Sequence, residues 1–185
     1  MKFDHIKEFW ESKSTLRETS HNSACDSNLT ESHAEVYDFD EVKNRYFGVV
    51  RESAAPGKSA DALLVVQGDK QDINVFIEFK DCKVERNEIR IKIADSLLVF
   101  NDLTGSQLHD RKTDSDFILV YSAKKNPPTA SGNKKYIENK VLDKANKKMI
   151  RFDLDKYDGT YFRKLMTYDE EEFRSYLERS GVPVG

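Results

Sequence analysis

Three charged residues lie at the ends of two apolar runs in the first half of the chain. Asp61 directly precedes the run Ala62–Val66, and Glu78 and Lys80 close an alternating run that begins at Ile73. Alternation along a strand places Glu78 and Lys80 on the same face. A short turn that contains Gly and Asp joins the two runs as a hairpin, which can bring Asp61 to that face. The spacing therefore predicts two carboxylates and a lysine at one end of a strand pair.

These residue types can hold a divalent metal ion. The carboxylates of Asp61 and Glu78, with the backbone carbonyl of Phe79 between the acid and the lysine, would offer three hard oxygen ligands. Mg²⁺ or Mn²⁺ accepts such ligands and keeps waters and substrate phosphate oxygens. The metal would lower the pKa of a bound water and neutralise charge that builds on phosphorus. Lys80 would orient the attacking water or stabilise the same charge.

This constellation resembles the PD-(D/E)XK nuclease superfamily, whose members share a restriction-endonuclease-like core. Asp61 matches the first acid, and Glu78-Phe79-Lys80 matches the (D/E)XK segment. The order of elements also matches over roughly 38–122: helix, strand with Asp, turn, strand with Glu-x-Lys, helix, strand. Ser59-Ala60 stands before the acid where the family pattern has proline. The resemblance implies a metal-dependent nuclease that cleaves DNA, or as a second choice RNA, with Asp61, Glu78 and Lys80 as catalytic residues.

The resemblance also suggests further site residues. Many members carry an acid on the first helix that contributes to the metal site, and Glu41 is the candidate here, although a role in the helix cap explains it equally well. Arg86, Arg90 and Lys92 follow the motif, where a helix would let them reach substrate phosphates. A solvated helix face explains these three residues equally well. The lysines of 134–148 are spread around a predicted helix, which favours a role in solubility.

Two other interpretations stay open. Glu78 and Lys80 could lie on an ordinary solvated strand face, with Asp61 in a turn. Against this, the run is the most apolar of the chain, and charges there are costly unless they are paired or bound to metal. The rival function is a catalytically inactive nuclease-fold protein that acts as a protein-interaction module or an accessory of a defence or toxin system. The net charge of −3, the pI of 5.9 and the acidic stretch Asp169–Glu172 suit a protein partner better than DNA.

Composition indicates a single soluble domain. The chain has 185 residues, 38% of them hydrophobic and 34% charged, and lacks an apolar run that approaches the roughly 20 residues of a membrane span. The first residues lack the features of a signal peptide, so we expect a cytoplasmic protein without a membrane partner. Cys25 and Cys82 are expected to be free thiols. We expect nucleic acid as the partner, and a homodimer or a protein partner is open.

The predicted elements give an α/β fold with a mixed central β-sheet flanked by α-helices. Residues 1–185 form one domain, with an N-terminal helix and polar arm (1–36), a nuclease-like core (37–155) and a C-terminal helical extension (156–185). The polar stretch Ser12–His33 is expected to be a long loop or mobile arm. Helices are expected at 6–9, 40–51, within 84–100, at 134–148 and at 168–180, and strands at 62–66, 73–80, 117–122 and 149–154.

Overall fold

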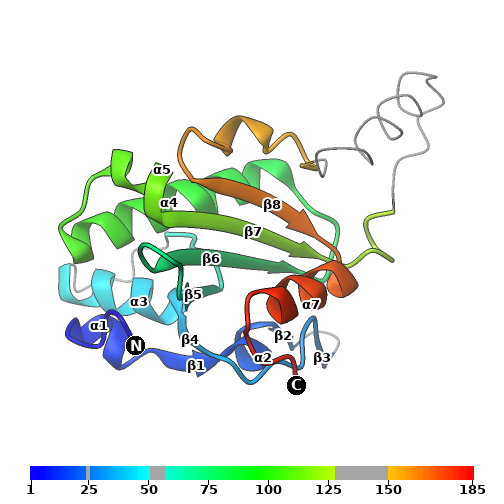
Figure 1. The fold of residues 1–185 in the computed structure, drawn as a ribbon, viewed down its shortest axis with the longest axis horizontal. Coiled ribbons are helices and arrows are strands. Elements are labelled where there is room, and N and C mark those ends of the chain that lie inside the picture. Colours follow the sequence, from blue (N-terminus) through cyan, green and yellow to red (C-terminus); the bar gives the residue numbers. More distant parts are fainter. Residues whose placement is uncertain (24–25, 51–56, 128–149) are drawn as a thin grey trace.

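The computed structural model describes residues 1–23, 26–50, 57–127 and 150–185, with only the backbone described at 49 and 50. Six strands form one mixed sheet in the order β1-β4-β5-β6-β7-β8 (Figure 1). The strands from β1 to β6 pair antiparallel, while β6, β7 and β8 run parallel. This confirms the predicted α/β class with a mixed sheet. The strands are β1 (Lys13–Thr15), β4 (Glu35–Asp38), β5 (Ala62–Val66), β6 (Ile73–Lys80), β7 (Ser115–Tyr121) and β8 (Lys164–Tyr168).

Helices cover both faces of the sheet (Figure 1). Buried residues of α1 (Lys7–Trp10), α3 (Phe39–Val50) and α4 (Arg86–Thr104) pack on one face, and those of α2 (Leu16–Thr19) and α7 (Glu170–Arg179) pack on the other. The connection from β6 to the parallel β7 runs through α4, as a parallel crossover requires. The remaining short elements are β2 (His21–Asn22), β3 (Ser27–Asn28), a 3₁₀ turn at Leu108–Asp110, α5 (Arg111–Asp114) and a second 3₁₀ turn at Asp155–Tyr157.

The hairpin that carries the predicted site forms as expected. β5 and β6 pair antiparallel with Ala62 opposite Ile77. Alternation along β6 sends Ile77 into the core under α7, while Phe76 enters the core under α4 and packs against Phe39 and Phe100 at ring distances of 5.4 and 5.2 Å. Because side chains alternate along a strand, the even-numbered residues of β6 all point toward the α4 layer.

The N-terminal polar segment is part of the fold and contains β1 and α2, so its prediction as a long loop is wrong. β1 pairs with β4 as the edge of the main sheet, and Leu16 is fully buried. Thr15 and Glu18 form a reciprocal capping box at α2, so polar side chains satisfy the backbone groups of a one-turn helix. A few buried apolar side chains and side-chain hydrogen bonds to the backbone therefore order a segment whose composition suggests disorder.

The last strand of the sheet lies later in the chain than predicted. The described part of 149–154 is not a strand, because Phe152 and Asp153 adopt left-handed backbone conformations with φ of 64° and 52°. The edge strand is β8, which pairs with β7 in parallel. The sequence predicts a helical extension at 156–185. The structure instead places β8 of this segment in the central sheet and packs α7 on one face of that sheet.

The helices predicted within the described residues are confirmed. α1 and α3 lie within two residues of their expected bounds, and α4 continues past the predicted end to Thr104. At α7, Asp169 caps the N-terminus and Gly181 follows the C-terminus with φ of 68°. The predicted helix 134–148 and Cys25 lie outside the described residues, and Cys82 is a free, exposed thiol. Within the described ranges, no helix has the length and apolarity to cross a membrane.

Candidate active site

Asp61 is held at the junction of β5, β6 and α3 by three hydrogen bonds. Its backbone N–H donates to the Ile77 carbonyl at 3.0 Å, and its own carbonyl accepts from Phe39 N–H at 3.0 Å. Its side chain accepts from the Phe79 N–H through Oδ2 at 2.6 Å. The carboxylate is therefore fixed beside β6, with Oδ1 left to face the space under α4.

Glu78 and Lys80 project to the same face of β6, as the alternation predicts. The Glu78 side chain is fully buried, and Lys80 Nζ lies 3.3 Å from its Oε1. This ion pair lacks the geometry of a hydrogen bond, so Glu78 Oε1 has no hydrogen-bond partner among the described residues. A buried carboxylate oxygen with only a loose ion pair is an open acceptor, and leaving it so is costly.

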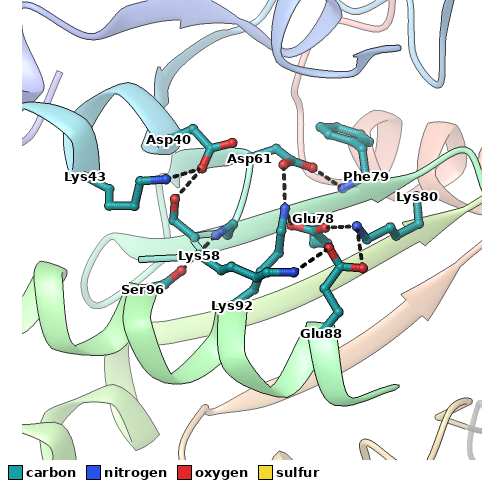
Figure 2. Close-up of polar contacts among 12 residues, drawn as sticks. Asp40, Lys43, Lys58, Asp61, Glu78, Phe79, Lys80, Glu88, Lys92 and Ser96 are labelled. Atoms are coloured by element: carbon teal, nitrogen blue, oxygen red, sulfur yellow. Dashed lines mark hydrogen bonds and ion pairs between the residues drawn. The ribbon is translucent and has the colours of Figure 1, made fainter. Parts of the chain in front are cut away.

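The ammonium of Lys92 lies between the two carboxylates (Figure 2). Its Nζ is 3.0 Å from Asp61 Oδ1 and 2.8 Å from Glu78 Oε2. Lys92 projects from α4, and its side chain is 11% exposed. The sequence predicted Lys92 as a contact to substrate phosphate; the structure places it inside the carboxylate pair, where it bridges the two acids.

Burial decides the direction of the pKa shifts of the two acids, and the acids decide those of the lysines. Desolvation, with a smaller effect of the nearby Asp61 charge, raises the pKa of Glu78 to about 8 against the pull of Lys92 and Lys80. Burial also raises the pKa of Asp61. Burial lowers the pKa of Lys80 and of Lys92, but the facing carboxylates outweigh it and both pKa values end above the ordinary value. The lysines therefore carry the charge that compensates the fully buried Glu78 and the largely buried Asp61.

Glu88 and Lys58 extend the charge cluster away from the two acids. One carboxylate oxygen of Glu88, on α4, lies 3.2 Å from Lys80 Nζ, and the other lies 3.2 Å from Lys58 Nζ (Figure 2). Glu88 has a lowered pKa, because Lys80 and Lys58 outweigh the effect of its burial. The cluster thus extends from the buried pair to Lys58, whose side chain is half exposed.

The acid of α3 that belongs to this region is Asp40. It accepts hydrogen bonds from Lys43 at 3.2 Å and from Ser59 Oγ at 2.5 Å, and its charge adds to the raised pKa of Asp61. Glu41, the residue predicted for the metal site, instead pairs with Arg45 at 3.2 Å. Only half of the expected helix cap is present: Asp38 Oδ1 accepts the Glu41 N–H at 3.0 Å, whereas the Asp38 N–H donates to the Ser12 carbonyl at 2.8 Å and not to the Glu41 side chain.

The two arginines predicted as nucleic-acid contacts make other contacts in this structure. Arg86 pairs with Asp153, and its side chain is exposed. Arg90 lies 3.5 Å from the Asn87 side-chain oxygen, three residues earlier on α4. Both residues lie on the helix that carries Lys92, but neither of these contacts belongs to the carboxylate cluster.

α4 carries further candidate site residues, Glu88, Asp95 and Ser96, to which the sequence alone did not point. Ser96 Oγ accepts the Ala60 N–H at 2.8 Å, and Asp95 accepts the Lys58 N–H at 2.9 Å, so α4 also fixes the segment that leads into Asp61. Glu88, Lys92 and Ser96 repeat at four-residue spacing, which places them on one face of a helix. In the sequence, this polar stripe runs beside the apolar stripe of Ile89, Ile93 and Leu97. That pattern could have indicated that Glu88, Lys92 and Ser96 lie close to the sheet.

The donor chemistry of the pair fits a hard divalent cation. Asp61 Oδ1 and Glu78 converge on one cationic nitrogen, and Glu78 keeps an open oxygen. In an antiparallel pair, the N–H and C=O of one residue point to the same side. The Phe79 carbonyl therefore shares the strand edge on which its N–H meets Asp61. In the described part of the chain, no group of three or more His, Cys, Asp or Glu side chains is arranged to hold a metal ion. A metal would thus need this carbonyl and waters besides the two carboxylates.

Comparison of the chain with protein-family models, curated proteins and solved structures found no match. A function for this chain therefore has to be inferred from its sequence motif, its order of elements and the geometry of the cluster.

Proposed function

We propose that this protein is a divalent-metal-dependent nuclease with a restriction-endonuclease-like core, which hydrolyses phosphodiester bonds in DNA and, as a second choice, in RNA. The observation that carries the proposal is the convergence of Asp61 Oδ1 and Glu78 Oε2 on one cation, at 3.0 and 2.8 Å. Lys80 lies beside them on the same strand face. Two buried acids that face one point, with a lysine next to them, suit metal-assisted attack on a phosphate.

The order of elements supports the proposed core. α3, Asp61 with β5, the turn, β6 with Glu78-Phe79-Lys80, α4 and β7 follow each other as the resemblance implies. β6 and β7 are interior strands of the sheet, so the motif lies on a rigid element.

Each residue of the motif has a defined role in this proposal. Asp61, Glu78 and the Phe79 carbonyl would hold Mg²⁺ or Mn²⁺. The metal supplies a water of lowered pKa and neutralises charge on the phosphorus when it is bound. Lys80, held between Glu78 and Glu88, would orient the attacking water and donate to the phosphate oxygen that gains charge.

The alternative is a catalytically inactive protein of the same fold, which acts through a protein partner. A specific observation favours it: the Lys92 ammonium already forms ion pairs with both carboxylates. In that case the cluster would be structural, and mixing with Mg²⁺ or Mn²⁺ would change neither binding nor cleavage. For either function we expect a cytoplasmic location, where the exposed Cys82 stays reduced.

The deciding experiment is cleavage of linear and supercoiled DNA and of single-stranded RNA with Mg²⁺ or Mn²⁺. Wild type is compared with Asp61→Asn, Glu78→Gln and Lys80→Met, and with Asp69→Asn in the exposed turn of the same hairpin as matched control. We expect rapid cleavage by wild type and Asp69→Asn only, and no cleavage by any of the proteins in EDTA. Equal cleavage by all five proteins would refute the assignment. Folded wild type that cleaves none of the substrates and binds no metal would favour the inactive alternative.

A further inference from the structure

Only one carboxylate oxygen of Asp61 is available to bind a cation. Oδ2 accepts the Phe79 N–H at 2.6 Å, so only Oδ1 faces the site. Lys92 Nζ uses that oxygen at 3.0 Å, together with Glu78 Oε2 at 2.8 Å. Any second cation that binds both acids must therefore approach an oxygen that Lys92 already holds.

We propose that Lys92 is a built-in competitor for the divalent metal: its ammonium holds Asp61 and Glu78 together in the metal-free protein and must leave Asp61 before a metal binds both acids. This inference rests on the proposed metal site. It adds a residue that sets the affinity of the site for metal, which the nuclease motif does not contain. A metal that contacts oxygen at about 2.1 Å and an ammonium cannot share one side of the same carboxylate without strong repulsion.

The position of Lys92 is built by the fold. The residue projects from α4, whose neighbouring Ile89 and Ile93 are buried in the core, so the stem starts from a fixed point. Its side chain is only 11% exposed, which leaves water little access to replace the ammonium. An ammonium that a helix supplies at hydrogen-bond distance from both acids forms the closed state of the site.

Other lysines provide matched controls for charge. Lys58 Nζ contacts Glu88 at 3.2 Å and neither acid of the pair, so Lys58→Met removes the same charge from the cluster without opening Asp61. Lys92→Met removes the competing ammonium. Lys92→Gln also removes the charge but keeps a hydrogen-bond donor for one carboxylate, which protects the fold if the methionine variant is unstable.

The test is the dissociation constant for Mn²⁺, measured by calorimetry on folded wild type, Lys92→Met, Lys92→Gln and Lys58→Met. Removal of a competitor restores the fraction of sites that can bind, so both Lys92 variants should bind about tenfold tighter or more, and Lys58→Met less than about threefold tighter. In ¹⁵N-lysine spectra of the wild-type protein, titration with Mg²⁺ should shift the signal of the buried Lys92 ammonium.

Each other result has a clear meaning. An equal gain in all three variants would assign the effect to long-range charge and overturn the competition. Unchanged or weaker binding in both Lys92 variants, with wild-type binding that Asp61→Asn abolishes, would sink this inference and leave the proposed metal site intact. If wild type and the Lys92 variants all fail to bind Mn²⁺, the proposed function and the inference fall together. Binding by the Lys92 variants alone would support the competitor and assign the wild-type protein to the inactive alternative.

Discussion

The backbone N–H of Phe79 donates to Asp61 Oδ2 at 2.6 Å, and this hydrogen bond ties the first acid of the site to the strand that carries the second. Asp61 lies just outside β5, where the ladder with β6 ends. Its side chain continues the ladder by one bond. The same carboxylate therefore serves the strand pair through one oxygen and the candidate metal site through the other.

Substitutions at Asp61 should separate these two roles. Asp61→Asn keeps an oxygen for the Phe79 N–H but loses the charge, so Mn²⁺ binding should fall by about 100-fold while the fold persists. Asp61→Ala also leaves a partly buried N–H without a partner, which costs about 1–3 kcal/mol. Chemical denaturation with calorimetry on both variants measures the difference. Equal stability of the two variants would contradict the structural role.

Lys80 should matter for the chemical step and not for metal binding. Its Nζ pairs with Glu78 and Glu88 but offers no ligand to a cation. We expect Lys80→Met to cleave DNA about 10²–10³-fold more slowly, because it loses the group that stabilises charge on the phosphate. Its dissociation constant for Mn²⁺ should not increase. If Lys80→Met lost metal affinity by the same factor as activity, Lys80 would have a structural role instead.

Glu78 should make the metal-free protein less stable as the pH rises. Burial raises its pKa in the folded state to about 8 from an ordinary value of 4.5. Between these values the folded state binds more protons than the unfolded state, so the contribution of Glu78 to stability is present below pH 4.5 and is lost as the pH rises through about 8. The charges of Asp61, Lys80 and Lys92 face the Glu78 carboxyl. Its pKa stays raised although the two lysines pull it down.

The Glu78→Gln variant tests this linkage, because glutamine does not titrate. In EDTA, the free energy of unfolding of the variant relative to wild type should increase from about pH 5 to about pH 8. Denaturant titrations at both values measure it. A difference that stays constant with pH, or that falls, would contradict a raised pKa of Glu78.

Leu16 should contribute to global stability although its surroundings in the sequence are polar. It is fully buried in the core that β4, β5 and α7 share, so Leu16→Ala should cost about 2–5 kcal/mol. The exposed neighbour Arg17 provides the control, since Arg17→Ala removes only a surface ion pair with Glu31. Equal and small effects of both substitutions would mean that the N-terminal segment is not part of the cooperative fold.

The hairpin and its acids were predictable because strand alternation is a local property. Ile73–Lys80 alternates except at Phe76, and the two-residue period of a strand places Glu78 and Lys80 on one face. The N-terminal segment was mispredicted because its order depends on a few long-range contacts, such as β1 with β4, that composition does not reveal. The left-handed residues Phe152 and Asp153 interrupt an apolar pattern that otherwise reads as a strand.

The role of Lys92 could not be predicted, because it depends on which face of α4 meets the sheet. The buried stripe of Ile89, Ile93 and Leu97 fixes that face. Lys92 and Glu88 lie at its border, but the sequence does not say how far the helix lies from the ends of β5 and β6. Only tertiary packing brings the ammonium to the acids.

The charge balance of the cluster predicts that metal and phosphate bind cooperatively. Metal binding requires ionised carboxylates, and in that state four lysines face four acids, so a bound divalent ion leaves excess positive charge that an anionic phosphodiester can offset. The members are Asp40, Asp61, Glu78 and Glu88 with Lys43, Lys58, Lys80 and Lys92. Mn²⁺ should therefore bind about fivefold tighter or more when a short DNA duplex is present, and the duplex should bind tighter by the same factor with Mn²⁺.

This coupling can be measured by calorimetry in the Lys80→Met protein, which should cleave the duplex too slowly to disturb the titration. A duplex with neutral methylphosphonate linkages at its centre is the matched control, because it keeps the shape of the substrate without the charge at the site. We expect cooperative binding with the phosphodiester and little with the methylphosphonate. The same coupling for both duplexes would place the DNA away from the metal, and no coupling for either would argue against a phosphate-binding role for this cluster.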